Sequence, residues 1–161
     1  MTDPPERHHD FPARILRSAD PRRPGLATAP NDTLVLAVAP ATSALAAARD
    51  AVRAFLRRLT VPEGAVYDVV LSLEEACKNA IRFSGSNCPI DVTVATDATD
   101  VSLEVRDHGV GFEPRPIDTT VPPDPLDIQG RGLFLMTCLM DDVRVACDGG
   151  TVVTMRKVVA P

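Results

Sequence analysis

The sequence predicts an α+β domain, a two-layer α/β sandwich in which a mixed, mostly antiparallel sheet carries helices on one face and leaves the other face open to solvent. Two observations support this prediction. Stretches with apolar residues at helical spacing are interleaved with short stretches in which apolar and polar residues alternate. The chain also has 161 residues, which is the length of one domain with a core of its own.

Two long helices are expected in the first half of the chain. The first begins near Thr42 or Ser43, either of which can cap it, and it ends before Val61-Pro62. Its buried stripe consists of Leu45, Ala48, Val52, Phe55, Leu56 and Leu59. The second helix is expected over residues 63–84, and a shorter one over residues 132–140.

Strand patterns occur at five places in the sequence. They lie at residues 33–38, 90–96, 101–106, 143–147 and 151–157. The second and third patterns flank a polar turn at residues 97–100, so an antiparallel hairpin is expected there. The last two patterns flank the turn Asp148-Gly149-Gly150, which closes the sheet.

Two segments show no such periodicity. Residues 1–30 are rich in proline and arginine, and we expect a flexible tail with at most a short docking turn around Ile15-Leu16. A single folded domain would then occupy residues 31–161. Residues 113–129 are rich in proline and acid, and connections of that length are usually lids, binding loops or disordered segments.

Charge and composition exclude several kinds of partner. The formal charge of −5 argues against nucleic acid or an anionic membrane as the main partner, because either would favour a basic surface. No apolar run approaches the roughly 20 residues that span a bilayer. The N-terminal sequence lacks the order of a signal peptide, so we expect a reducing cytoplasm. Cys77 and Cys138 lie in apolar helical patterns and are expected to be buried.

One polar stripe stands out on the second helix. Glu75 and Asn79 are four residues apart, so they project from the same helical face. Asp68, Ser72 and Arg82 extend this stripe. Taken alone, the pattern is typical of an amphipathic surface helix whose polar face meets water.

Two glycine-rich segments change that interpretation. Residues 107–112, with the pattern Asp-x-Gly-x-Gly, follow directly on a strand, where Gly109 and Gly111 permit positive φ and close backbone approach. Residues 129–133 place Gly130, Arg131 and Gly132 at the start of a helix, where free N–H groups suit phosphate oxygens. Each segment alone is equally compatible with an ordinary turn or a helix cap.

Together, the three motifs resemble the N, G1 and G2 boxes of the GHKL or Bergerat ATPase fold, the histidine kinase-like ATPase domain found also in gyrase and in heat-shock chaperones. The length and the sequence around Glu75 resemble the anti-sigma-factor serine/threonine kinases. The resemblance covers roughly residues 33–157. It departs from the family at Phe83, where a histidine is frequent.

The resemblance implies a role for each matching residue. Asn79 matches the ligand of Mg²⁺, and Glu75 matches the carboxylate that takes a proton from the attacking hydroxyl. Asp107 matches the acceptor for the adenine amino group. The other matching residues would surround the nucleotide: Gly109 and Gly111 beside the base, Gly130, Arg131 and Gly132 in the lid over the phosphates, and Thr151 near the adenine.

The implied function is a kinase that uses ATP and Mg²⁺ to phosphorylate an anti-sigma factor antagonist and thereby regulates a sigma factor. A nucleotide-binding regulator that acts by partner binding, with little or no phosphoryl transfer, is the alternative. A purely structural domain would bind no nucleotide, and a histidine kinase would need a phosphoacceptor hairpin for which this chain has no room outside its tail. Homodimerisation is common among such kinases, but no apolar stripe here identifies an interface.

Overall fold

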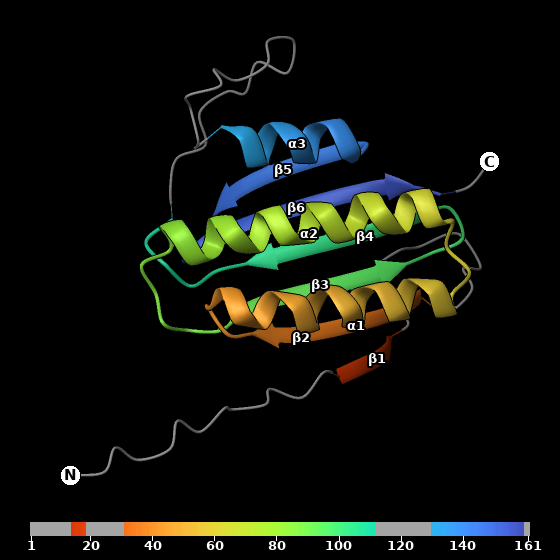
Figure 1. Ribbon diagram of the computed structural model, residues 1–161, viewed down its shortest axis with the longest axis horizontal. Coiled ribbons are helices and arrows are strands. Elements are labelled where there is room, and N and C mark those ends of the chain that lie inside the picture. Colours follow the sequence, from red (N-terminus) through yellow and green to blue (C-terminus); the bar gives the residue numbers. More distant parts are fainter. Residues whose placement is uncertain (1–13, 19–30, 112–129, 160–161) are drawn as a thin grey trace.

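The computed structural model describes residues 14–18, 31–111 and 130–159, which form a two-layer sandwich (Figure 1). Six strands make one sheet in the order β1-β2-β3-β4-β6-β5, and every pairing among them is antiparallel. The helices lie side by side on one face of this sheet (Figure 1). The predicted α+β fold with helices on one face is therefore confirmed.

The bounds of the elements agree closely with the sequence patterns. The strands are β1 Arg14–Ser18, β2 Asn31–Val38, β3 Ile90–Thr96, β4 Asp100–Arg106, β5 Asp142–Cys147 and β6 Thr151–Val158. The helices are the short 3-10 helix η1 Thr42–Ala44 and the α-helices α1 Leu45–Arg58, α2 Glu63–Phe83 and α3 Arg131–Leu139.

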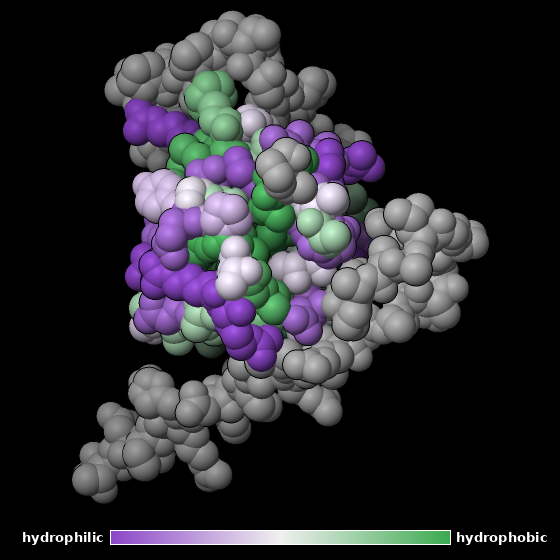
Figure 2. All heavy atoms as spheres, turned by 90° about the vertical axis from the view of Figure 1, so that its right-hand side faces the viewer, coloured by the Kyte–Doolittle hydropathy of each residue, from purple (hydrophilic) through white to green (hydrophobic). Residues whose placement is uncertain are grey.

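The core lies between the helices and the sheet because each element turns its apolar side inward. Val92 and Val94 of β3 are fully buried, whereas Thr93 between them is only half-buried. This alternation places one set of side chains against the helices. Leu56 of α1 and Leu73 of α2 are buried above them. Figure 2 shows hydrophobic side chains between two more hydrophilic outer surfaces when the sandwich is seen end-on.

The prediction that Thr42 or Ser43 caps the first helix is wrong. Thr42 and Ser43 instead belong to η1, which continues directly into α1. The N-cap of α1 is therefore Ala44, and no side-chain hydrogen bond caps the helix. Because the 3-10 turn itself leads into the α-helix, the two hydroxyl side chains do not stand at its first free N–H groups.

The expected tail contains a strand. The five residues of β1 pair with β2 from Arg14↔Val35 to Ser18↔Asn31, which corrects the expectation of a flexible segment for this part of residues 1–30. Without β1, the strand β2 would expose a row of unpaired backbone groups at the sheet edge. That edge is created by the fold, so local composition did not reveal it. The proline-rich stretch at residues 113–129 lies outside the described residues.

The two cysteines that were expected to be buried differ in their exposure to solvent. Cys77 is buried in α2, and this burial raises the pKa of its thiol to about 12. Cys138 is exposed, contrary to the prediction. On α3 only Gly132 and Met136 are fully buried, and Cys138 lies two residues beyond Met136, on the other side of the helix. Among the described helices, none is long and apolar enough to cross a membrane.

Candidate functional site

A cavity of about 340 Å³ opens between α2, α3 and the neighbouring ends of β4, β5 and β6. Three of its lining side chains, Asn79, Asp107 and Thr151, are polar. The apolar lining consists of Ala76, Ala80, Phe83, Val105, Leu133, Met136, Val145 and Val153. A mostly apolar cavity with a few convergent polar groups is typical of a small-molecule site.

Asp107 is held rigidly at the end of β4. Its side chain is buried, and its Oδ1 accepts hydrogen bonds from the backbone N–H groups of Gly109 at 2.9 Å and Thr151 at 3.1 Å. The backbone N–H of Asp107 donates to the carbonyl of Thr151 at 2.9 Å. Both carboxylate bonds among the described residues go to Oδ1, so Oδ2 is available to accept a hydrogen bond from a ligand amino group.

The glycines around Asp107 allow backbones to approach closely. Gly111 has a φ of +70°, as the sequence suggested, but Gly109 does not use positive φ. A Cβ at Gly109 would instead collide with the backbone of Ser84, which follows α2. Gly150 was missed as a site residue. A Cβ there would collide with the carbonyl of Asp107, and the only signal in the sequence is the turn at residues 148–150.

Glu75 and Asn79 face the start of α3. A Cβ at Gly132 would lie 3.0 Å from Glu75 Oε2 and 3.5 Å from Asn79 Oδ1. Any side chain larger than glycine at position 132 would therefore press on these two polar groups. The Glu75 side chain is only 20% exposed, and Ser72 on the same stripe is fully buried. Glu75 and Asn79 thus lie against α3 rather than in open water, whereas Arg82 at the end of the stripe is exposed.

The first turn of α3 contains the remaining predicted residues. Gly130 is the N-cap, and its carbonyl accepts a hydrogen bond from the N–H of Phe134 at 3.0 Å. The backbone N–H groups at this end carry the positive pole of the helix. Arg131 is exposed, and in the described structure its side chain is not part of the cavity lining. The structure therefore brings Gly132 into the site but not the guanidinium of Arg131.

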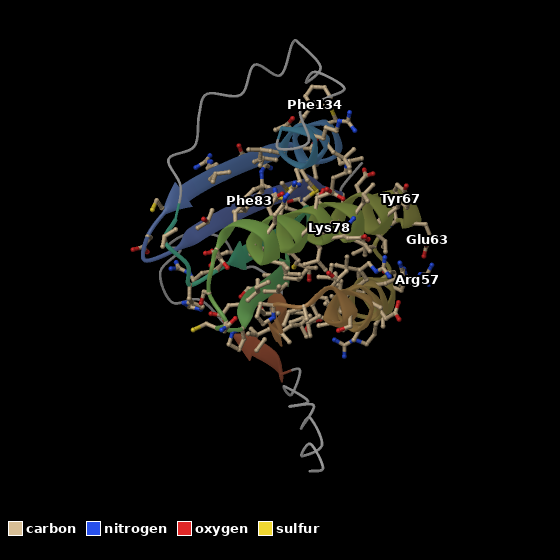
Figure 3. All side chains as sticks on the ribbon, turned by 60° about the vertical axis from the view of Figure 1, so that its left-hand side comes forward. Arg57, Glu63, Tyr67, Lys78, Phe83 and Phe134 are labelled. Atoms are coloured by element: carbon tan, nitrogen blue, oxygen red, sulfur yellow. The ribbon has the colours of Figure 1, made fainter. Side chains whose placement is uncertain are left out.

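A chain of charges leads from α1 to Glu75, and sequence reasoning missed it. Arg49 Nη1 lies 2.9 Å from Glu74 Oε2, and Lys78 Nζ lies 2.8 Å from Glu74 Oε1 and 3.1 Å from Glu75 Oε1. The hydrogen bond from Lys78, followed by that from Arg49, holds the pKa of the Glu74 carboxyl below its ordinary value. The same contact with Glu74 raises the pKa of Lys78. Figure 3 shows Lys78 on α2 between Phe83 and Tyr67.

Asn79, the predicted metal ligand, fits an Mg²⁺ ion that is bound together with a nucleotide. The amide oxygen of Asn79 is a hard donor of the kind that Mg²⁺ prefers. Within the described residues, no cluster of three or more His, Cys, Asp or Glu side chains is placed to hold a metal ion. A single amide oxygen therefore fits an ion that takes its other ligands from phosphates and water.

Phe83 is a second residue whose role the sequence did not reveal. The related kinases frequently have a histidine at this position. In this chain the ring of Phe83 lines the cavity. The side chain is 39% exposed, and the guanidinium of Arg82 lies 5.3 Å from the ring centroid. Its ring can provide an apolar, planar surface for a planar ligand.

Phe83→Ala is expected to weaken binding of an adenine nucleotide roughly tenfold, because stacking of a base on an aromatic ring contributes about 1–3 kcal/mol. Titration with a fluorescent ATP analogue measures this change. Tyr67→Ala is the matched control, since Tyr67 is an exposed aromatic residue of the same helix outside the cavity lining. Equal affinities of the Phe83→Ala variant and the control would contradict this role.

Two known proteins are similar to this chain over part of their length. The serine-protein kinase RsbW of Bacillus licheniformis is 34% identical over 106 residues, which cover 57% of this chain and 64% of that protein. RsbW of Bacillus cereus (strain ATCC 10987 / NRS 248) is 30% identical over 101 residues, which cover 57% of this chain and 63% of that protein. The match thus spans less than two thirds of the length of these relatives.

A solved structure shows the same fold. The crystal structure of the RsbU and RsbW domains of Rv1364c from Mycobacterium tuberculosis superimposes with a TM-score of 0.63 at 19% sequence identity, covering 83% of this chain and 34% of that one. The sequence profile of the histidine kinase-like ATPase domain matches residues 15–157, which begin within β1 and end within β6. This chain therefore belongs to the histidine kinase-like ATPase domain family.

Proposed function

We propose that this chain is a serine/threonine protein kinase of the anti-sigma-factor type, which uses ATP and Mg²⁺ to phosphorylate an anti-sigma factor antagonist and thereby regulates a sigma factor. One observation carries the proposal. A single cavity has the buried carboxylate of Asp107 among its lining, and Glu75 and Asn79 meet the start of α3 beside it. The relatives named serine-protein kinase support the choice of acceptor.

Adenine would occupy the apolar part of the cavity. Its amino group would donate to Asp107 Oδ2, because Oδ1 is already engaged by two backbone N–H groups. Thr151 would contribute its hydroxyl nearby, since it lines the cavity. A guanine base would present a carbonyl oxygen to the same carboxylate, and two acceptors facing each other disfavour binding. The site therefore favours adenine.

The phosphates would lie where α2 meets the start of α3. Gly132 carries no Cβ that would press on Glu75 and Asn79 there, and the helix N-terminus that follows Gly130 attracts negative charge. Asn79 would hold Mg²⁺ through its amide oxygen. When bound, Mg²⁺ neutralises charge on the β- and γ-phosphates.

The transfer step needs a base beside the γ-phosphate. The oxygen of a partner serine or threonine would form a bond to the γ-phosphorus, while the bond from that phosphorus to the bridging oxygen of ADP breaks. Glu75 would accept the hydroxyl proton, and ADP would leave with the bonding electrons. The half-buried position of Glu75 next to Gly132 supports this assignment.

The alternative is a nucleotide-binding regulator with little or no transfer. One contact favours it, because Glu75 Oε1 is engaged by Lys78 at 3.1 Å. That hydrogen bond occupies one of the two carboxylate oxygens, so fewer lone pairs are left to accept a hydroxyl proton. Incubation with labelled ATP, Mg²⁺ and candidate antagonist proteins separates the two functions. Label on a serine or threonine of the partner is expected for the kinase, whereas nucleotide binding without transfer to any candidate would favour the regulator.

Asn79→Ala is expected to remove most of the effect of Mg²⁺ on ATP binding. In the unaltered protein, Mg²⁺ should tighten ATP binding. In the variant, the Kd for ATP measured with Mg²⁺ and the Kd measured without it should agree to within about threefold, because the amide oxygen is lost. Asn87→Ala serves as the control, because Asn87 is an exposed amide in the loop after α2. A full Mg²⁺ effect in Asn79→Ala, measured by calorimetric titration, would contradict the assigned metal ligand.

A further inference from the structure

The short helix α3 packs on α2 through one apolar side. Of its nine residues, Gly132 and Met136 are buried, and Leu133 and Leu139 are partly buried against the core. Its first turn meets the polar groups of Glu75 and Asn79, as described above. A polar contact at its other end adds to this packing and bears on how the helix is seated over the site.

Lys157 of β6 holds that other end. Its Nζ donates a hydrogen bond of 2.8 Å to the carbonyl of Leu139, the last residue of α3. The same ammonium group lies 2.7 Å from Asp68 Oδ2 on α2. The side chains of Lys157 and Asp68 are only 20% and 23% exposed. One cation thus joins α2, α3 and β6.

The physical chemistry favours this arrangement. The carbonyl groups at a helix C-terminus carry partial negative charge, so a cation there is stabilised. The carboxylate of Asp68 compensates the same ammonium group in a largely solvent-excluded position. Removing one partner of such a pair leaves the other charge uncompensated, and the local structure must rearrange.

The anchor and the site lie at opposite ends of the same two helices. In Figure 1, α2 and α3 run side by side in opposite directions. Asp68 and Asn79 are eleven residues apart on α2, which corresponds to roughly 16 Å along a helix axis. The nine residues of α3 extend over about 13 Å. A helix this short moves as one rigid rod, so holding its C-terminal end also orients its N-terminal end.

We infer that Lys157 is a positioning residue, which seats α3 so that Gly132 stays against Glu75 and Asn79. The inference rests on the proposed function, because it assigns the start of α3 to the phosphates. Lys157 acts on the nucleotide only through α3. Its loss should therefore affect the triphosphate more strongly than the base.

The test compares two ligands, Mg·ATP and adenosine, by calorimetric titration of the full chain. Lys157→Met should raise the Kd for Mg·ATP about tenfold while the Kd for adenosine changes less than about threefold. Lys157→Arg should restore Mg·ATP binding, because arginine can also donate to Leu139 and pair with Asp68. Arg156→Met is the control, since Arg156 is the neighbouring cation and pairs with Asp100 elsewhere.

The outcomes distinguish failure of the positioning role of Lys157 from failure of the proposed function. An unchanged Kd for Mg·ATP in folded Lys157→Met, or equal losses for Mg·ATP and adenosine, would overturn the positioning role and leave the proposed function intact. Failure of the unaltered chain to bind either ligand would overturn both. If Lys157→Met does not fold, Asp68→Asn gives the same test, since it keeps the hydrogen bond to Leu139 and removes the charge partner. It should show a smaller loss that is again selective for Mg·ATP, and a non-selective loss or none would overturn the inference.

Discussion

Asp107→Asn is expected to weaken binding of Mg·ATP by roughly 10- to 100-fold, because a hydrogen bond to a charged group contributes about 1.5–3 kcal/mol. The asparagine oxygen can still accept the two backbone hydrogen bonds that now reach Oδ1. Its amide nitrogen would then replace Oδ2 and present a donor to the adenine amino group. The fold should therefore survive while recognition of the base is lost.

Titration of the unaltered protein and the variant with a fluorescent ATP analogue measures this loss. Asp148→Asn is the matched control, because Asp148 is an exposed carboxylate in the neighbouring β5–β6 turn and its side chain is 79% exposed. Thermal unfolding should show similar melting temperatures for both variants. Unchanged nucleotide affinity in Asp107→Asn would refute the assignment of Asp107 to the adenine.

Glu75→Gln is expected to lower the rate of phosphoryl transfer by roughly 10²- to 10⁴-fold, which is the usual contribution of a general base. The amide keeps the size of the carboxylate but cannot accept the hydroxyl proton. Affinity for Mg·ATP should not fall, because the change removes a negative charge near the phosphates. Single-turnover transfer of label from ATP to a partner protein measures the rate.

Glu74→Gln is an unusually close control for this experiment. Glu74 and Glu75 are adjacent, their side chains are 19% and 20% exposed, and both contact Lys78. Only Glu75 also lies next to Gly132. Glu74→Gln should therefore transfer phosphate within about threefold of the unaltered protein. Transfer by Glu75→Gln at the unaltered rate would mean that another group, or none, removes the proton.

Much of the fold could be predicted because its elements are locally encoded. The helix α2 has an apolar side that recurs at helical spacing, and its observed bounds, Glu63–Phe83, differ from the expected ones by a single residue. The hairpin of β3 and β4 follows equally from alternation around a polar turn. The strand β1 could not be predicted in this way, because its partner is the edge of β2 and only the assembled sheet creates that edge.

The site was partly predictable for a different reason. The motifs containing Asn79, Asp107 and Gly132 were recognised by their order along the chain, and the structure brings them to one cavity and the adjoining start of α3. Phe83 and Gly150 were missed because their contribution depends on contacts between distant elements. The role of Arg131 at the phosphates stays a prediction, because its side chain is exposed at the start of α3 and outside the described lining of the cavity.

In the function proposed above, one cavity binds adenine at Asp107 and a metal–phosphate group at Asn79. A crystal structure of the full chain with a non-hydrolysable ATP analogue and Mn²⁺ in place of Mg²⁺ tests it most directly. We expect the adenine amino group within hydrogen-bond distance of the Asp107 carboxylate, and an anomalous Mn²⁺ peak beside the Asn79 amide oxygen. An analogue bound outside this cavity, or a metal peak away from Asn79, would contradict it.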